Sequence, residues 1–246
     1  MTSPPRYPSC WVVRLAVAKT QKFGVSQSGD TVEIIERPDG GLSVVVADGQ
    51  RSGPAAKRVA NLVVRRVIAL LAEGVRDGAA ARAASDALYT ARQGRVQATL
   101  NILSVDMDAQ SVVVVRNNPL PVLVMRQGRL EVLAEPSEPV GLRRYTRPVV
   151  REYPLEEDLY VLAFTDGVAH AGTRGGNGWD IAGAFRKHVQ RLSGQVEAIA
   201  DALLEEAVRL DDGRPQDDMT LALLALARQP AGNLPPIRRL QAQVPL

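Results

Sequence analysis

Segments of strand length and of helix length are grouped along this chain rather than alternating, and this grouping most constrains its fold. Strand-like runs come first, followed by two helical stretches, a long series of strands, two more helices and a final strand. Regular alternation would favour a parallel sheet, whereas grouped elements favour an α+β fold with largely antiparallel sheets. We therefore predict a four-layer αββα sandwich, in which two packed sheets are flanked by helix pairs.

The strands are expected where apolar and β-forming residues run between turn residues. Asp39-Gly40-Gly41 supplies a turn that joins two such runs into a hairpin. The second run, LSVVVA, is continuously apolar, which is typical of a strand covered on both faces. The expected strands are residues 10–17, 31–36, 42–47, 97–105, 111–116, 121–126, 130–133, 149–153, 159–165 and 219–227.

Four helices are expected, over residues 54–71, 79–93, 181–191 and 196–210. Pro54 suits the start of the first helix, and apolar residues then recur at helical spacing. A chain of 246 residues is long enough to bury one substantial core. We predict a single domain over residues 1–228, followed by a proline-rich C-terminal tail over residues 229–246.

Composition excludes several classes of function. Basic residues are scattered and aromatic residues make up only 4%, so no nucleic-acid partner is expected. One cysteine and two histidines exclude a disulfide framework and a metal site built from either residue type. No run approaches the roughly 18 apolar residues that cross a bilayer. No secretory signal is visible either, so we expect a cytoplasmic protein without membrane association.

Three aspartates recur in one context, at the ends of apolar strands. Asp48-Gly49 follows LSVVVA, Asp166-Gly167 follows LYVLAFT, and Asp217 precedes MTLALLALA. Taken singly, an Asp-Gly pair after a strand is most often a plain turn. Together, carboxylates held at strand ends suit hard divalent ions such as Mg²⁺ or Mn²⁺, which prefer oxygen ligands. The joint pattern therefore predicts a metal site.

The residues around these aspartates resemble the metal-dependent serine/threonine phosphatases of the type 2C class, within their SpoIIE-like branch. The resemblance covers about residues 24–227 and keeps the order and spacing of the family's motifs. The matching segments are SGD at 28–30, VADG at 46–49, SGPAA at 52–56, ATL at 98–100, RNNPLP at 116–121, FTDGV at 164–168 and QDDMT at 216–220.

The resemblance implies a centre of two Mn²⁺ or Mg²⁺ ions. Asp48 would bridge both ions, the Gly49 carbonyl would bind one, and Asp166 and Asp217 would bind the other. Asp30 would act nearby through metal-bound water, which makes Asp30, Asp48, Asp166 and Asp217 the expected catalytic residues. Because paired metals can activate a water for attack on phosphorus, no side-chain nucleophile is required.

One segment departs from the family. Between Gly49 and Gly53 the branch often has a small or apolar residue, glycine, then His or Asn, whereas this chain has Gln50-Arg51-Ser52. A histidine that could protonate the leaving oxygen is therefore missing. Arg51 is either a bidentate phosphate contact or a solvated loop residue. We interpret Asp218 as holding Asp217 rather than as a ligand.

The resemblance implies hydrolysis of phosphoserine and phosphothreonine in a protein substrate. Stand-alone, RsbX-like members act in bacterial partner-switching circuits, where a phosphorylated STAS-domain protein would be the partner. The altered segment beside Gly49 keeps an alternative open, a catalytically weak or inactive regulatory binding module with the same fold. A small-molecule phosphoesterase is a third possibility.

Overall fold

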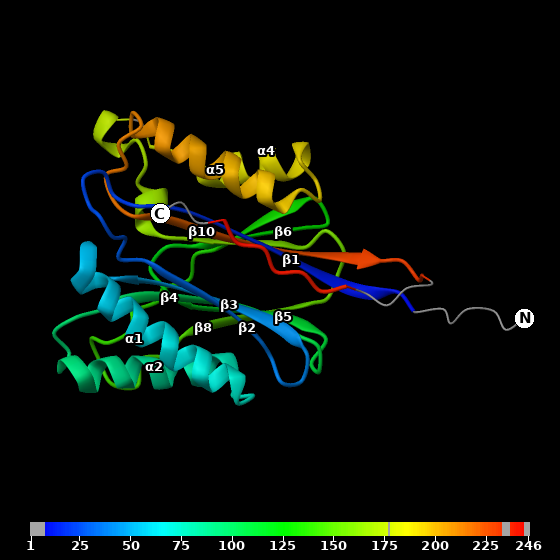
Figure 1. Ribbon diagram of the computed structural model, residues 1–246, viewed down its shortest axis with the longest axis horizontal. Helices are drawn as coiled ribbons and strands as arrows, with labels where there is room; N and C mark the ends of the chain where they lie inside the picture. Colours follow the sequence, from blue (N-terminus) through cyan, green and yellow to red (C-terminus); the bar gives the residue numbers. More distant parts are fainter. Residues whose placement is uncertain (1–7, 177, 233–236, 244–246) are drawn as a thin grey trace, which may run out of the picture.

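The structure is a computed structural model that describes residues 8–176, 178–232 and 237–243. Two five-stranded sheets pack face to face, and each is covered on its outer side by a pair of helices (Figure 1). Every pairing between neighbouring strands is antiparallel. The predicted four-layer αββα sandwich is therefore confirmed.

The first sheet has the strand order β2-β3-β4-β5-β8. Its strands are β2 (Thr31–Glu36), β3 (Gly41–Gly49), β4 (Ala98–Asp106), β5 (Ser111–Asn117) and β8 (Val149–Pro154). In β3 the side chains alternate between two cores: Val45 and Ala47 pack on the helix side, and Val44 and Val46 pack on the second sheet. The unbroken apolar run of this strand is explained by burial on both faces.

The second sheet has the order β1-β10-β9-β6-β7, so the last strand lies between the first strand and β9. Its strands are β1 (Cys10–Thr20), β6 (Val122–Arg126), β7 (Arg129–Leu133), β9 (Tyr160–Phe164) and β10 (Met219–Gln229). The register pairs Thr220 with Lys19 on one side of β10 and Leu221 with Phe164 on the other. This register brings the end of β1, the end of β9 and the start of β10 together.

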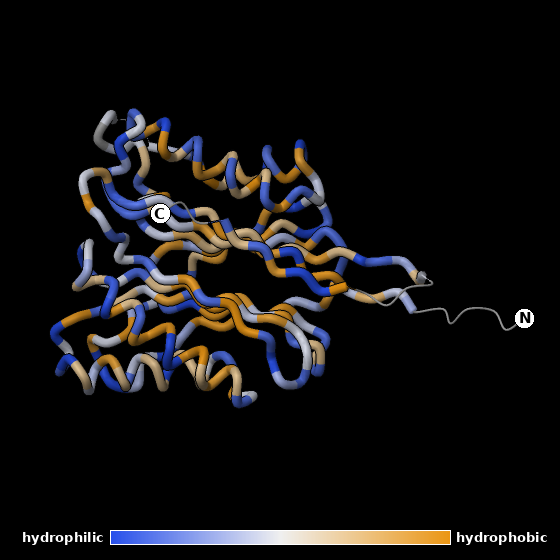
Figure 2. The backbone as a smooth tube through the Cα atoms, in the orientation of Figure 1, coloured by the Kyte–Doolittle hydropathy of each residue, from blue (hydrophilic) through white to orange (hydrophobic). Residues whose placement is uncertain are grey.

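The helices cover the two outer faces. The first sheet carries α1 (Gly53–Ala72) and α2 (Asp77–Arg92), and the second carries α4 (Ile181–Arg191) and α5 (Val196–Leu210). Figure 2 shows apolar segments between the sheets and on the inner sides of the helices. The short helices α3 (Asp166–Ala169) and η1 (Thr173–Gly175) lie between β9 and α4 and were not predicted.

Two further observations concern the surface and the chain end. Over the part of the chain that the structure describes, no helix has both the length and the apolar character that a bilayer span requires. Residues 237–243 form no regular element, and Arg238 reaches Glu36 at 3.2 Å across the surface.

Candidate metal centre

The four aspartates predicted as catalytic lie at one end of the sandwich, on the left in Figure 1. Asp30 directly precedes β2 and Asp48 is the penultimate residue of β3, so the first sheet supplies both. Asp166 begins α3 just after β9 and Asp217 lies two residues before β10, so the second sheet supplies both. We call this group, Asp30, Asp48, Asp166 and Asp217, the carboxylate end.

Asp30 links the two sheets. Its side chain is fully buried, and its Oδ2 accepts hydrogen bonds from the hydroxyls of Thr220, at 2.6 Å, and Thr165, at 3.1 Å. Among the residues described, its other oxygen, Oδ1, has no hydrogen-bond partner. A buried carboxylate oxygen without a partner is costly. Asp48 can share a hydrogen bond with Asp30 only while one of the two is protonated, so the ionised pair needs a cation instead.

The carboxylates shift one another's pKa values. Burial and the negative charges of Asp30, Asp166 and Asp217 raise the pKa of Asp48 to about 10. Burial raises the pKa of Asp30 to about 6, and burial together with Asp217 raises that of Asp166. Carboxylates this close cannot all ionise without added positive charge. Divalent cations would supply that charge.

Two glycines allow the backbone to approach this site closely. A Cβ on Gly49 would lie 2.1 Å from the Ala56 carbonyl oxygen of α1, and a Cβ on Gly167 would lie 2.3 Å from the Asp218 carbonyl oxygen. No side chain fits at either position. The Asp-Gly pairs are therefore packing requirements as well as turn signals.

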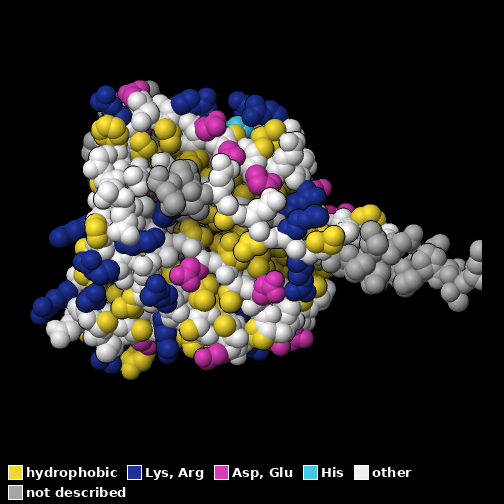
Figure 3. Space-filling model, in the orientation of Figure 1, with side chains coloured by type: hydrophobic (Ala, Val, Ile, Leu, Met, Phe, Trp, Pro, Cys, Tyr) yellow, Lys and Arg dark blue, Asp and Glu magenta, His cyan; other side chains and the backbone are white. Residues whose placement is uncertain are grey.

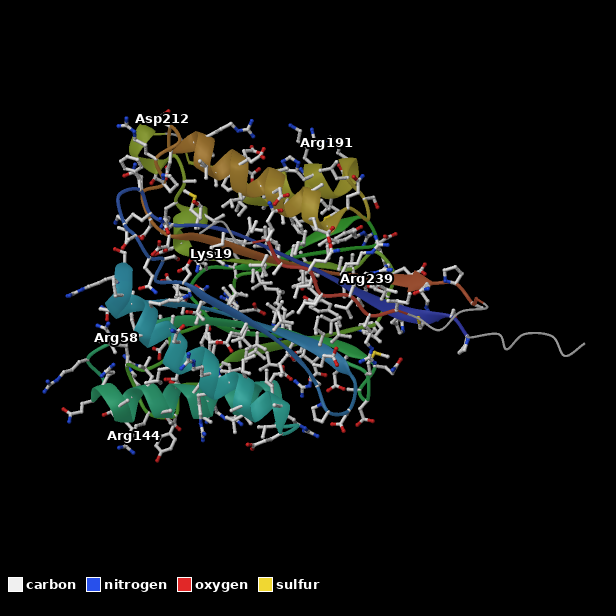
Figure 4. All side chains as sticks on the ribbon, viewed as in Figure 1. Lys19, Arg58, Arg144, Arg191, Asp212 and Arg239 are labelled. Carbon is white, nitrogen blue, oxygen red and sulfur yellow. The ribbon has the colours of Figure 1, made fainter. Side chains whose placement is uncertain are left out.

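Two lysines that the sequence did not single out also contact this end. Lys19, near the end of β1 (Figure 4), and Lys57, the fifth residue of α1, each donate to the Asp30 carbonyl oxygen at 2.6 Å. Burial lowers the pKa of both ammonium groups. Neither lysine stands in a sequence motif that would have drawn attention to it, because both reach Asp30 through tertiary contacts.

Asp218 holds a loop as well as its neighbour. Its backbone N–H donates to Asp217 Oδ1 at 2.9 Å, which is the expected link. Its own carboxylate accepts from the backbone N–H groups of Lys22, at 2.9 Å, and Gly29, at 2.8 Å. The segment between β1 and β2 is thus fastened at both ends to the start of β10.

Asp211, the C-cap of α5, also holds two loop segments together through its carboxylate. Its carboxylate accepts from the backbone N–H groups of Gly172, at 2.9 Å, and Gln216, at 2.8 Å. It thereby ties the loop after Asp166 to the segment before Asp217. These loops enclose a pocket of about 200 Å³, lined by Asp166, Gly167, His170, Thr173, Asp211, Gln216 and Asp217.

The segment that departs from the family has a specific conformation. Gln50 binds the residue just before β4, because its backbone N–H donates to the Gln97 carbonyl at 3.1 Å and its side-chain oxygen accepts from Gln97 N–H at 3.3 Å. Arg51 is exposed and has φ of +74°. Glycine, which the branch often has here, adopts that conformation freely, whereas arginine pays about 1–2 kcal/mol. Arg51 is therefore retained against a conformational cost.

The residues fit hard divalent ions by the chemistry of their donor atoms. The donors are carboxylate and carbonyl oxygens, Asp30 Oδ1 lacks a partner, and the clustered charges require cations. In residues 8–176, 178–232 and 237–243, no group of three or more His, Cys, Asp or Glu side chains is positioned, as it stands, to hold a metal ion. The side chains must therefore adjust when ions bind, while the backbone already brings them together.

The chain is similar in sequence to proteins of one known family. The family model described as Stage II sporulation protein E (SpoIIE) matches residues 38–227. Stage II sporulation protein E of Priestia megaterium is 24% identical over 222 residues, which cover 88% of this chain. The alignment covers only 37% of that relative, so this chain spans well under half of its length.

Two solved structures show the same fold. The PP2C phosphatase domain of SpoIIE from Bacillus subtilis, with a fragment of its regulatory domain, has a TM-score of 0.78 at 19% identity and covers 90% of this chain and 65% of its own. RsbX in complex with magnesium has a TM-score of 0.66 at 18% identity and covers 87% of this chain and 96% of its own. The predicted resemblance to type 2C phosphatases is confirmed, and because the family model spans most of its length, this chain belongs to the SpoIIE family.

Proposed function

We propose that this chain is a metal-dependent phosphoprotein phosphatase that hydrolyses phosphoserine and phosphothreonine. One observation carries the proposal: carboxylates from both sheets meet at one buried end of the sandwich, where burial first, and the charges of Asp30, Asp166 and Asp217 second, raise the pKa of Asp48 to about 10. A protein stabilises such a cluster in its ionised form by binding cations. The magnesium complex of RsbX, which has the same fold, supports a divalent ion.

Two Mn²⁺ or Mg²⁺ ions would be held by Asp48, the Gly49 carbonyl, Asp166 and Asp217. Asp48 suits a position between the ions, because it senses the charges of Asp30, Asp166 and Asp217 together. When bound, paired ions supply Lewis acidity and positive charge for hydrolysis of a phosphate monoester.

The protein's own groups orient the reactants. Thr220 and Thr165 hold Asp30 Oδ2, so the Asp30 carboxylate is oriented beside Asp48 as a proton acceptor. Lys19 and Lys57 fix the Asp30 backbone. Of the two predicted roles of Arg51, phosphate contact and solvated loop residue, we propose the phosphate contact, because the conformational cost of its left-handed backbone supports a role for its side chain.

The first test measures hydrolysis of p-nitrophenyl phosphate with Mn²⁺, with and without a chelator. Asp166→Asn is expected to lower kcat/KM by more than about a hundredfold, because even residues that only support metal ligands contribute 10–100-fold. Asp201→Asn, an exposed aspartate on α5, is the matched control and is expected to behave as wild type. The proposal would be refuted if the hydrolysis rate were unchanged both by the chelator and by the Asp166→Asn substitution.

A catalytically weak or inactive regulatory module remains the second candidate. It is favoured by Gln50, whose side chain binds the residue just before β4 where relatives carry their small or apolar residue, and by the absence of the neighbouring histidine. If wild type shows no metal-dependent turnover and Asp166→Asn is indistinguishable from it, the chain is a binding module. Turnover of phosphorylated metabolites but of no phosphoprotein would instead indicate a small-molecule phosphoesterase.

The substrate we propose is a phosphorylated STAS-domain protein of a bacterial partner-switching circuit, met in the cytoplasm. The membership in the SpoIIE family and the fold shared with RsbX support this assignment. Asp166→Asn can serve as a trap: it should retain a phosphorylated STAS-domain protein that Asp201→Asn releases. Suppose instead that the trap captures an unrelated phosphoprotein, which the wild type dephosphorylates. The proposed substrate would then be wrong, while the proposed phosphatase activity would be supported.

A further inference from the structure

The loop between β1 and β2 carries an exposed aromatic ring beside the pocket. Phe23 is 63% exposed, yet its backbone is fixed because its N–H donates to the Pro215 carbonyl at 2.9 Å. On either side of Phe23, the Asp218 carboxylate holds Lys22 N–H and Gly29 N–H. A large apolar side chain is thus displayed to solvent from an anchored loop.

Arg214 lies against this ring. Its guanidinium carbon is 5.4 Å from the centre of the Phe23 ring, within the range of a cation–π contact. The Arg214 backbone N–H donates to the Asp211 carbonyl at 2.9 Å, and Gln216, two residues further on, lines the pocket. We call Phe23 and Arg214 together the platform. The platform is held by the same segment that leads into Asp217.

The surroundings of the platform are predominantly cationic. A Cβ on Gly29 would lie 3.5 Å from the Arg51 carbonyl oxygen, so the Arg51 segment borders the loop of Phe23. Three arginines of these segments are exposed: Arg51, Arg58 and Arg214. They are accompanied by one exposed carboxylate, that of Asp212. Figure 3 shows Lys and Arg side chains along this side of the molecule, and Figure 4 labels Arg58 on α1. An anionic partner is therefore favoured over a cationic one.

We propose that the platform docks the protein segment next to the phosphorylated residue of the substrate. An apolar side chain of that segment packs on Phe23, and an acidic group pairs with Arg214. This inference rests on the proposed function and narrows its substrate class to acidic phosphoprotein segments with an apolar residue close to the phosphoserine. A small phosphate ester has no flanking segment, so it gains nothing from the platform.

The test compares p-nitrophenyl phosphate with two synthetic phosphoserine peptides. One peptide carries Leu and Glu close to the phosphoserine, and the other has Gly at both positions. For Phe23→Ala and Arg214→Ala, the ratio of kcat/KM on the Leu-Glu peptide to kcat/KM on p-nitrophenyl phosphate is expected to fall roughly tenfold, the effect of losing one interface anchor. On the Gly peptide the same ratio should change little.

Tyr145→Ala is the matched control. Tyr145 is an aromatic residue with 76% exposure, and its backbone N–H donates to Asp86 of α2, away from the platform. The control should keep both ratios. Unchanged ratios in Phe23→Ala and Arg214→Ala would overturn the inference, as would equal losses on the Leu-Glu and Gly peptides.

The proposed function can fail separately from the platform. If wild type does not hydrolyse p-nitrophenyl phosphate with Mn²⁺, the phosphatase proposal fails. Fluorescence anisotropy of the labelled Leu-Glu phosphopeptide then still tests docking: roughly tenfold weaker binding by Phe23→Ala, with wild-type binding by Tyr145→Ala, supports the platform. Equal binding by all three proteins refutes it.

Discussion

The two ends of the first sheet both bury aspartate carboxylates, but they stabilise them in opposite ways. At the start of β3, Asp77 of α2 pairs with Arg37 at 3.0 Å and accepts a hydrogen bond from Ser104. Ser104 in turn contacts Ser43 at 2.7 Å. We call this network, Arg37, Asp77, Ser104 and Ser43, the paired end.

At the carboxylate end, roughly 17 Å further along β3 by strand geometry, the balance is reversed. Asp30 Oδ1 has no partner among the residues described, and the pKa of Asp48 rises to about 10 because burial and neighbouring negative charges oppose its ionisation. Lys19 and Lys57 donate to the Asp30 carbonyl rather than to a carboxylate, and the charge of Lys19 offsets only part of the rise that burial causes in the pKa of Asp30. The comparison teaches that this fold compensates one buried charge for stability and leaves another set uncompensated for binding.

The largest expected effect comes from Asp48→Asn, which should separate function from stability. Activity with Mn²⁺ should fall on the order of a thousandfold, equivalent to about 4 kcal/mol of transition-state stabilisation, because a shared ligand is lost. Without metal, the variant should melt about 2–4 °C higher than wild type, since the native state no longer has to keep a buried carboxyl group protonated. Scanning calorimetry in chelator measures this, and a lower melting temperature for the variant would contradict the uncompensated character of this end.

Removing the ion pair at the paired end should lower stability and leave activity unchanged. Asp77→Ala leaves the buried Arg37 without its counter-charge and is expected to cost about 3 kcal/mol in the free energy of unfolding. Activity per folded molecule should stay at the wild-type value. Urea denaturation followed by circular dichroism gives the first quantity and an assay at low temperature gives the second. A loss of activity without a loss of stability would show that the two ends are coupled.

The smallest expected effect is on pH dependence. In the metal-free native state the pKa of Asp30 is about 6 and that of Asp48 about 10, against roughly 3.9 for an unfolded aspartate. The native state therefore binds more protons, so this contribution is complete below about pH 4 and is lost as pH rises through 6 and toward 10. The melting temperature in chelator should fall by several degrees between pH 5 and pH 8, and saturating Mn²⁺ should remove the decline.

Asp48→Asn is the control for this pH dependence, because it removes the group with the larger shift and should flatten the curve. A metal-free wild-type protein that melts higher at pH 8 than at pH 5 would show that the carboxylates are compensated by groups other than metal. The carboxylate end would then resemble the paired end.

The sequence by itself determined the architecture. The continuous apolar run of β3, the hairpin turn at Asp39-Gly40-Gly41 and the helical spacing after Pro54 are local patterns, and each appears in the structure close to its expected range. The strand-end Asp motifs, together with the family resemblance, were also sufficient to predict that Asp48, Asp166 and Asp217 meet. Local periodicity and turn chemistry decide these features, so the linear sequence contains them.

Only the tertiary structure decided how the site is supported. Asp30 reaches Thr220, Asp218 reaches Lys22, and Phe23 meets Arg214, all across nearly the whole length of the chain. Such contacts exist because β10 inserts between β1 and β9, and no spacing in the sequence encodes which side chains then face each other. Carboxylates become uncompensated or paired through the neighbours that folding brings, which is why residue type predicted the metal centre while packing determined its charge balance.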